Sequence, residues 1–369
     1  MADASDMRIG DRQIGQRHEP YVIAEIGVNH DGSAQRAMEL VDVARQAGAD
    51  AVKLQFFEAH RLLSGASRLA EYQKRAGAGD PHEMLRRLEL PIEALRRIAG
   101  CAAESGLHPI VTVFSDEMVE AALSVEWAAF KTASSDIINR PLLEALAATG
   151  RPMLISTGAA TLNELRQAVQ WLGDHCFALL QCVTAYPTPD ESAHLAGMRA
   201  LQAVASVPVG YSDHTTSVDT GALAVAAGAC ILEKHITYDR KANGPDHSMS
   251  LEPAQFDRYV RLARRAHAML GRSSKQVIPI EQAVRQASRQ SIVATRTLKS
   301  GHVIARPDLT IKRPGTGIEP WRIDEIVGRR LRRTVDIDSP IVESDLEAVS
   351  INDAEDVAPL GTLMSREGS

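Results

Sequence analysis

The sequence predicts a (β/α)8 TIM barrel followed by a small α+β domain, and three observations support this. Between residues 21 and 236, eight short runs are almost continuously apolar, which is typical of parallel strands covered on both faces. The segments between these runs show apolar residues at helical spacing and often end in glycine. After about residue 290 the chain changes to short β-like runs with many turns.

The eight predicted strands alternate with predicted helices along the chain. The strands are placed at residues 21–27, 50–56, 109–114, 127–133, 152–157, 177–183, 207–212 and 230–236. The clearest helices are placed at residues 33–48, 90–106, 161–173 and about 252–270, the first of them beginning at a capping Ser33. Residues 58–89 exceed the usual length of a βα loop, so this segment is expected to help form the substrate site.

These elements divide the chain into four parts. We predict a catalytic barrel at residues 1–270, a linker at 271–290, a second domain at 291–350 and a disordered polar tail at 351–369.

Composition narrows the classes of function. The 369 residues include 41 basic and 47 acidic ones, giving a net charge of −6, and basic clusters such as residues 329–333 are short, so no nucleic-acid partner is expected. The longest apolar run, residues 221–232, is too short for a membrane span, and the polar first fifteen residues predict no signal peptide. Four scattered cysteines without CxxC spacing predict reduced thiols in a cytoplasmic protein.

Polar residues lie at the carboxyl end of every predicted strand, where barrels of this type carry their catalytic groups. Their convergence predicts a polar pocket. These residues are Glu25, Lys53, Gln55, Thr112, Lys131, Ser134, Ser156, Thr184, Ser212, His214, Lys234 and His235.

Three of these residues are lysines, and a buried ammonium group needs anionic company. Glu25 and Glu233 supply part of it, and the phosphate or carboxylate of a bound ligand would supply the rest. The alternative is that Lys53, Lys131 and Lys234 simply pair with glutamates at the barrel rim.

His214 and His235 end the last two predicted strands, which are neighbours in a barrel. Two neutral imidazoles with water or substrate oxygens form an open site for Mn²⁺, Zn²⁺ or a similar ion, suited to polarising a carbonyl. A hydrogen-bonded pair, or one histidine acting as an acid–base, is the alternative. His30 and His247 are weaker candidates.

Several longer motifs together resemble the sialic acid synthase family. The motifs are "IAEIGVNHDG", "VKLQFF", "KTASSDIINRPLL", "ISTGAAT", "AYPTP", "GYSDHT", "EKHIT" and "GPDHSMSLEP". Residues 71–91 look like the N-acetylneuraminate and legionaminate branches of that family, and "IKRPGTGI" resembles its C-terminal antifreeze-like, or SAF, domain. The resemblance extends from about Met7 to Val349.

The resemblance implies an enzyme that condenses phosphoenolpyruvate with an N-acylated hexosamine, such as N-acetylmannosamine or a 2,4-diacetamido-trideoxyhexose. It also implies Mn²⁺ or Mg²⁺ on His214 and His235, with Glu25 beside the metal and its water. The phosphoenolpyruvate residues would be Lys53, Thr112, Lys131, Ser134, Ser156, Thr184 and Ser212. The sugar would contact Gln55, Tyr186 and Asp246, together with Arg313 from the partner in a domain-swapped homodimer.

Two positions depart from the family pattern, which often has Glu at Asp136 and Asn at Thr184. Asp136 keeps a carboxylate, and either it or Glu25 would stabilise positive charge or deprotonate the attacking water.

Two other functions remain open at this point. Lys131 or Lys234 could form a Schiff base with a keto acid, as in class I aldolases. The C-terminal domain could instead make the chain a non-catalytic carbohydrate- or ice-binding protein.

Overall fold

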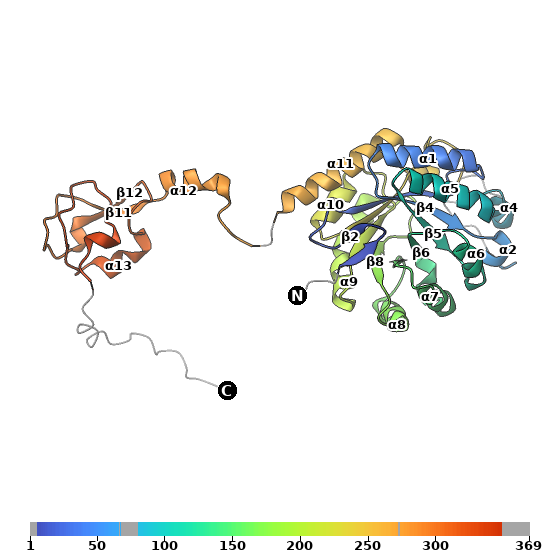
Figure 1. The fold of residues 1–369 in the computed structure, drawn as a ribbon, viewed down its shortest axis with the longest axis horizontal. Helices are drawn as coiled ribbons and strands as arrows, with labels where there is room; N and C mark the ends of the chain where they lie inside the picture. The colour runs from blue at the N-terminus through green and yellow to red at the C-terminus, as the bar shows by residue number, and fades with distance from the viewer. Residues whose placement is uncertain (1–5, 66, 68–79, 272–273, 349–369) are drawn as a thin grey trace, which may run out of the picture. The chain divides into compact units, whose positions relative to one another are not determined.

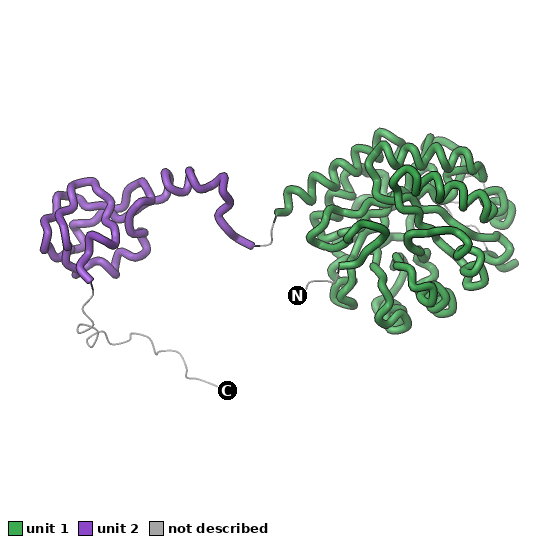
Figure 2. The backbone as a smooth tube through the Cα atoms, in the orientation of Figure 1, with its two compact units in different colours: residues 1–271 green, residues 272–369 purple. Residues whose placement is uncertain are grey.

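A computed structural model describes residues 6–65, 67, 80–271 and 274–348. The chain forms two compact units, residues 1–271 and 272–369, which are coloured separately in Figure 2. The tail predicted at residues 351–369 lies outside the described residues, as does part of the predicted loop at 58–89.

The first unit is a closed barrel of eight parallel strands surrounded by helices, so the predicted fold class is confirmed (Figure 1). The strands neighbour one another in chain order, and β10 closes the ring by pairing with β3, with Ile231 opposite Tyr21. The strands are β3 (Tyr21–Gly27), β4 (Ala51–Phe56), β5 (His108–Val113), β6 (Ala129–Thr132), β7 (Met153–Ser156), β8 (Phe177–Cys182), β9 (Val209–Asp213) and β10 (Ile231–His235).

The first helix of this unit, α1, shows the usual start and stop signals of a helix. Ser33 caps α1 by accepting a hydrogen bond from the backbone N–H of Arg36, and Gly48 follows the helix with a φ of +75°, which favours glycine. The helices are α1 (Ala34–Gln46), α2 (Ala59–Leu62), α4 (Pro81–Arg86), α5 (Ile92–Glu104), α6 (Val119–Leu123), α7 (Arg140–Ala147), α8 (Leu162–Leu172), α9 (Met198–Val204), α10 (Thr220–Ala226) and α11 (Pro253–Leu270).

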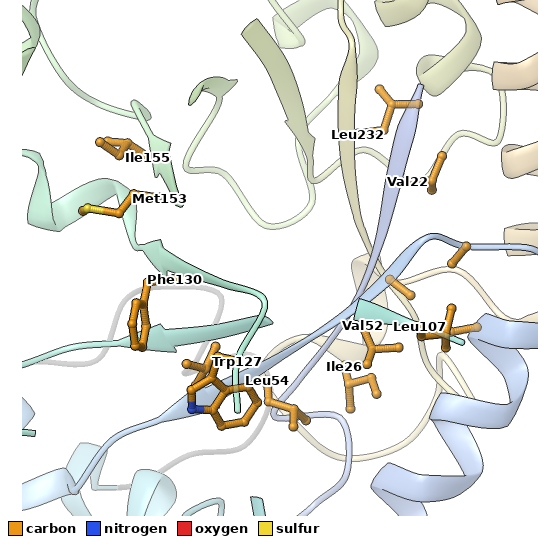
Figure 3. Close-up of a cluster of buried hydrophobic side chains, with 14 of the residues drawn as sticks. Val22, Ile26, Val52, Leu54, Leu107, Trp127, Phe130, Met153, Ile155 and Leu232 are labelled. Atoms are coloured by element: carbon orange, nitrogen blue, oxygen red, sulfur yellow. The ribbon is translucent and has the colours of Figure 1, made fainter. Parts of the chain in front are cut away.

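Side chains alternate between the two faces of the barrel wall. Those facing the helices form one large apolar layer, and Figure 3 shows Val52, Phe130, Ile155 and Leu232 among its members. The inner face is apolar only near the amino ends of the strands. Polar residues such as Lys53, Lys131 and Glu233 take over toward the carboxyl ends, so the polar side chains inside the barrel gather at one end.

A β-hairpin packs into the apolar end of the barrel. Its strands are β1 (Met7–Ile9) and β2 (Arg12–Ile14), and its Met7, Ile9 and Ile14 side chains are buried against inner-face residues such as Ile23. The sequence did not predict this hairpin, because three-residue strands are too short to show a periodic pattern.

The second unit has its own core, formed around Ile292, Leu331 and Ile341. Its elements are α12 (Gln282–Ser288), β11 (Ser291–Ala294), β12 (Leu309–Lys312) and α13 (Ile323–Ile326), with β11 and β12 antiparallel. The α12 helix lies within the segment expected to be a linker. Among the described residues of both units, no helix has the length and apolarity needed to cross a membrane.

Candidate active site

A pocket of about 200 Å³ opens at the carboxyl ends of the barrel strands. One water molecule occupies about 30 Å³ in the liquid, so the pocket has room for a small organic ligand. Its lining combines charged, hydroxyl-bearing and apolar side chains. The lining residues are Glu25, Val28, Lys53, Gln55, Met84, Leu85, Thr112, Phe114, Lys131, Ala133, Ser134, Ser156, Cys182, Tyr186, Ser212, His214, Glu233, His235, Pro245 and Asp246.

Two lysines and two glutamates form an ion cluster on the pocket floor. Lys53 Nζ lies 3.1 Å from Glu25 Oε2 and 3.4 Å from Glu233 Oε1. Lys131 Nζ is 3.9 Å from Glu233 Oε2, beyond hydrogen-bond distance. All four side chains are almost completely buried. Lys53 is therefore the well-paired cation of the cluster, and Lys131 is the poorly paired one.

Serine and threonine hydroxyls hold this cluster in place. Lys53 Nζ donates to Thr112 Oγ1 at 3.1 Å, and Lys131 Nζ donates to Ser156 Oγ at 2.5 Å. Ser212 Oγ donates to Glu233 Oε1 at 3.0 Å. Each of these hydroxyls lies on a barrel strand, so the cluster is attached directly to the wall.

The pKa values follow from this uneven pairing. Burial raises the pKa of Glu25 to about 7, although the charge of Lys53 opposes the shift. Burial lowers the pKa of Lys131, and the distant Glu233 does not compensate. Burial would also lower the pKa of Lys53, but Glu233 and Glu25 outweigh it and raise that pKa. An anionic ligand beside Lys131 would complete its pairing.

His214 and His235 lie side by side at the ends of the neighbouring strands β9 and β10, with ring centroids 5.4 Å apart. His214 Nδ1 lies 2.9 Å from the carbonyl oxygen of Val183, which leaves Nε2 available. Burial, followed by the charge of His214, lowers the pKa of His235 well below its usual value, so His235 is neutral. Its buried Nδ1 has no hydrogen-bond partner within the described part of the chain and lies 3.6 Å from Asp246 Oδ2.

These two imidazoles fit an open divalent metal site. Neutral imidazole nitrogens are good ligands for such ions, and the orphaned Nδ1 of the neutral His235 is a ring nitrogen that a further partner would satisfy. Burial would lower the pKa of His214, but Cys182 and the Val183 carbonyl outweigh it and raise that pKa, so an ion bound there would displace a proton. Across residues 6–65, 67, 80–271 and 274–348, no group of three or more His, Cys, Asp or Glu side chains is arranged to hold a metal. Any ion here would therefore keep positions for water or substrate.

The predicted sugar-contacting residues of the barrel all lie at the pocket. Tyr186 packs on His214 with ring centroids 4.2 Å apart. Gln55 Nε2 donates to Glu25 Oε1 at 2.8 Å, so this amide both lines the pocket and orients the carboxylate. Asp246 lies near His235, as described above. Arg313 belongs to the second unit.

Three residues expected at the pocket do not line it. Asp136 lies on a 3-10 turn after β6, and burial raises its pKa to about 6. Thr184 is exposed and turns its methyl group toward Gly158. Lys234 corrects our expectation of three lysines at the barrel mouth: it faces outward, where its Nζ pairs with Asp213 Oδ2 at 3.1 Å. Strand alternation explains the error, because Glu233 takes the inward position.

Several pocket residues were missed by the sequence analysis. Glu233 was considered only as a partner for lysines, yet it is central to the ion cluster. Its position two residues before His235 puts it on the same face of β10 and could have revealed it. Cys182 lines the pocket with Sγ 3.7 Å from His214 Nδ1. Met84 and Leu85 bring the long segment after β4 into the lining, as expected.

Comparison with known proteins finds relatives along most of the chain. The profile of the NeuB family matches residues 40–275, and that of the SAF domain matches residues 289–347. The N,N'-diacetyllegionaminic acid synthase of Legionella pneumophila is 37% identical over 338 residues, covering 89% of this chain and 95% of the relative. The N-acetylneuraminate-9-phosphate synthase of Homo sapiens is 33% identical over 337 residues, covering 90% and 94% respectively.

A solved structure is also similar to this chain. The N-acetylneuraminic acid synthetase of Leptospira borgpetersenii aligns with a TM-score of 0.70 and 28% identity, covering 76% of this chain and 95% of its own.

Proposed function

The chain belongs to the NeuB family, and we propose that it is a nonulosonic acid synthase, condensing phosphoenolpyruvate with an N-acylated hexosamine to give a nine-carbon keto acid and phosphate. The observation that carries this proposal is the presence in one pocket of a buried ion cluster with a poorly paired lysine and of a pair of imidazoles. Lys131 suits the carboxylate or phosphate of a ligand, and the imidazole pair suits a metal.

The residues of the floor would hold phosphoenolpyruvate. Lys131 is the poorly paired cation, so the carboxylate or phosphate of the substrate is its natural partner. Hydroxyls of Thr112, Ser134, Ser156 and Ser212 would orient the substrate so that its C3 meets the sugar aldehyde. Thr184 was expected to join them and would do so only after a movement of its loop.

His214 and His235 would hold the metal, Mn²⁺ or Mg²⁺ by family resemblance. When bound, such an ion supplies Lewis-acid polarisation of the sugar aldehyde. Gln55, Tyr186 and Asp246 would position the sugar beside the imidazoles. Glu25, whose pKa lies near 7, would accept the proton of the attacking water, with Asp136 as the alternative carboxylate.

A phosphate-release assay tests the proposal. Phosphoenolpyruvate and Mn²⁺ are incubated with the enzyme and a panel of N-acylated hexosamines, including N-acetylmannosamine and 2,4-diacetamido-trideoxyhexoses. Sugar-dependent phosphate release with formation of a keto acid is the expected result. Phosphoenolpyruvate labelled with ¹⁸O at the bridging oxygen should send the label into phosphate, because charge develops at C2. No sugar-dependent release across the panel would refute the proposal.

One observation favours a second candidate, a Schiff-base aldolase. Lys131 lines the pocket, and burial lowers its pKa, which is what an amine nucleophile needs. Borohydride reduction in the presence of pyruvate would trap a covalent adduct on Lys131, and activity would survive chelation. Lys234 is not a candidate for this role, since it faces away from the pocket.

We also propose a domain-swapped homodimer in the cytoplasm, in which Arg313 of one subunit reaches the sugar in the other. This rests on the family resemblance and on the position of Arg313 beside the turn at residues 314–317. Arg313→Ala and His214→Ala should each be inactive alone. Refolding them together should restore part of the activity, because mixed dimers contain one intact site. No recovery in proven mixed dimers would contradict the exchange.

A further inference from the structure

We propose that the buried ion pair between Lys234 and Asp213, on the outer face of the barrel, is a positioning device that sets His214 and His235 for metal binding. The inference deepens the proposed function and rests on it for the identity of the ligand. Neither residue touches the pocket, so they would act only through the histidines that follow them.

The register of the barrel places the pair directly beside the two histidines. Lys234 and Asp213 are opposite each other in the pairing of β10 with β9. One residue earlier, Glu233 is opposite Ser212, and these two side chains point inward and share a hydrogen bond. Each histidine immediately follows one member of the outer pair. A shift of the outer pair would therefore move both histidines.

The pair also clamps the backbone after His214. Asp213 Oδ1 accepts a hydrogen bond from the backbone N–H of Thr215 at 2.8 Å, and Lys234 Nζ donates to the carbonyl oxygen of the same residue. The carbonyl of His214 itself accepts from the backbone N–H of Thr188 at 2.9 Å. His214 is thus held on both sides at the point where the strand gives way to a loop.

The burial of these two charges costs free energy that apolar residues in the same place would not. Both side chains have an exposed fraction of 0%. Apolar residues such as Leu232 fill the same layer elsewhere (Figure 3). Replacing a buried ion pair by apolar residues often leaves stability unchanged or improved, so packing alone does not call for these charges. Directional bonds to Thr215, which apolar residues cannot make, are what the pair adds.

Tyr259 of α11 covers the pair from outside. The Lys234 Nζ lies 5.7 Å from the centre of its ring. Gly221 makes room for that ring, because a Cβ there would come within 2.4 Å of Tyr259 Cζ. The charges are therefore sealed from water by a helix, and the geometry they impose is rigid.

The test compares Lys234→Met, Asp213→Asn and the double variant with a matched control, Asp50→Asn. Asp50 is also a buried carboxylate, paired with Arg12 and bonded to the backbone of Val22, but it lies at the opposite end of the strands. For each full-length protein, the Mn²⁺ dissociation constant is measured by electron paramagnetic resonance and Tm by calorimetry. The ¹⁵N resonances of the histidine rings are recorded without metal.

We expect Lys234→Met to weaken Mn²⁺ binding at least tenfold and to shift the ring resonances of His214 and His235. The double variant should recover much of the Tm that Lys234→Met loses. It should still bind Mn²⁺ at least fivefold more weakly than the wild type, because the hydrogen bond to the Thr215 carbonyl is missing. Asp50→Asn should lower Tm while its Mn²⁺ affinity stays within twofold of wild type.

Wild-type Mn²⁺ affinity in the double variant would overturn the inference and leave the pair a purely structural feature. If the wild type binds no Mn²⁺, the metal part of the proposed function fails. The histidine ring resonances, recorded without metal, then still test whether the ion pair positions the two rings. Ring resonances unchanged by Lys234→Met would then overturn the positioning role as well.

Discussion

Glu233 and Lys234 are neighbours in one strand, and each belongs to a buried ion network, but the two networks are built differently. On the inner face, two carboxylates and two ammonium groups share contacts of 3.1 to 3.9 Å, and Lys131 is left poorly paired. On the outer face, one carboxylate meets one ammonium group at 3.1 Å, and both are bonded to a single backbone residue.

The difference teaches which network is open to a ligand. The outer pair joins its two charges at 3.1 Å, lies away from the pocket and is covered by Tyr259. The inner cluster lines the pocket, and it keeps Glu25, whose pKa burial raises to about 7, and Lys131, which lies 3.9 Å from its nearest carboxylate oxygen. The two networks therefore differ in how closely their charges are paired and in whether they line the pocket.

The largest expected effect comes from removing the imidazoles. His214→Ala or His235→Ala should each lower kcat by about a thousandfold or more, because the proposed polarising ion would no longer be held. Chelation of the wild type should give the same loss, and added Mn²⁺ should reverse it. Phosphate release measures the rate. Full activity after exhaustive chelation would mean that no metal acts here.

Glu25→Gln would sharpen the comparison through pH. The wild-type kcat/KM should rise as pH increases through about 7, because a base must first lose its proton, and Glu25 has that pKa. In the variant, kcat/KM should no longer rise with pH near 7, and the rate should be about a hundredfold lower than in the wild type. A retained limb near pH 7 in Glu25→Gln would assign the base to another group.

Lys131→Met and Lys234→Met would separate the two networks directly. Lys131→Met should raise KM for phosphoenolpyruvate by about tenfold to a hundredfold, the value of a charged hydrogen bond. Its stability should fall by less than that of Lys234→Met, because Glu233 keeps Lys53 at 3.4 Å. Lys234→Met should lower the free energy of unfolding by about 3–5 kcal/mol, since Asp213 is left without its partner. For both variants, urea unfolding measures the free energy of unfolding, and steady-state kinetics measure the KM for phosphoenolpyruvate. Equal losses of stability would erase the distinction.

The smallest expected effect concerns Asp136 and the pH dependence of stability. Burial raises its folded pKa from 3.8 to about 6, so the stabilisation it gives is complete below pH 4 and is lost as pH rises through 6. Asp136→Asn removes this loss. The stability of the variant relative to wild type should therefore be greater at pH 8 than at pH 4, by up to about 3 kcal/mol. Urea unfolding at both pH values checks this, and a constant difference would contradict it.

Much of this architecture could be predicted because the barrel strands are almost continuously apolar and alternate with segments of helical spacing. Period-2 alternation also decides which face a residue takes, and applying it to β10 would have separated Glu233 from Lys234. Asp136 and Thr184 lie beyond the strand ends, where alternation no longer places side chains. The β1–β2 hairpin and α12 were missed because short elements carry almost no periodic signal.

The closure of the barrel between β3 and β10 has a consequence for synthesis. Tyr21 leaves the ribosome long before its partner Ile231, and at about 5–20 residues per second the wait is on the order of 10 to 40 s. During that interval one edge of β3 has no partner strand, and such edges promote aggregation. The nascent chain is thus most vulnerable before its last strand emerges. Substitutions that weaken the incomplete barrel should reduce the yield of folded enzyme even when the finished barrel is as stable as wild type.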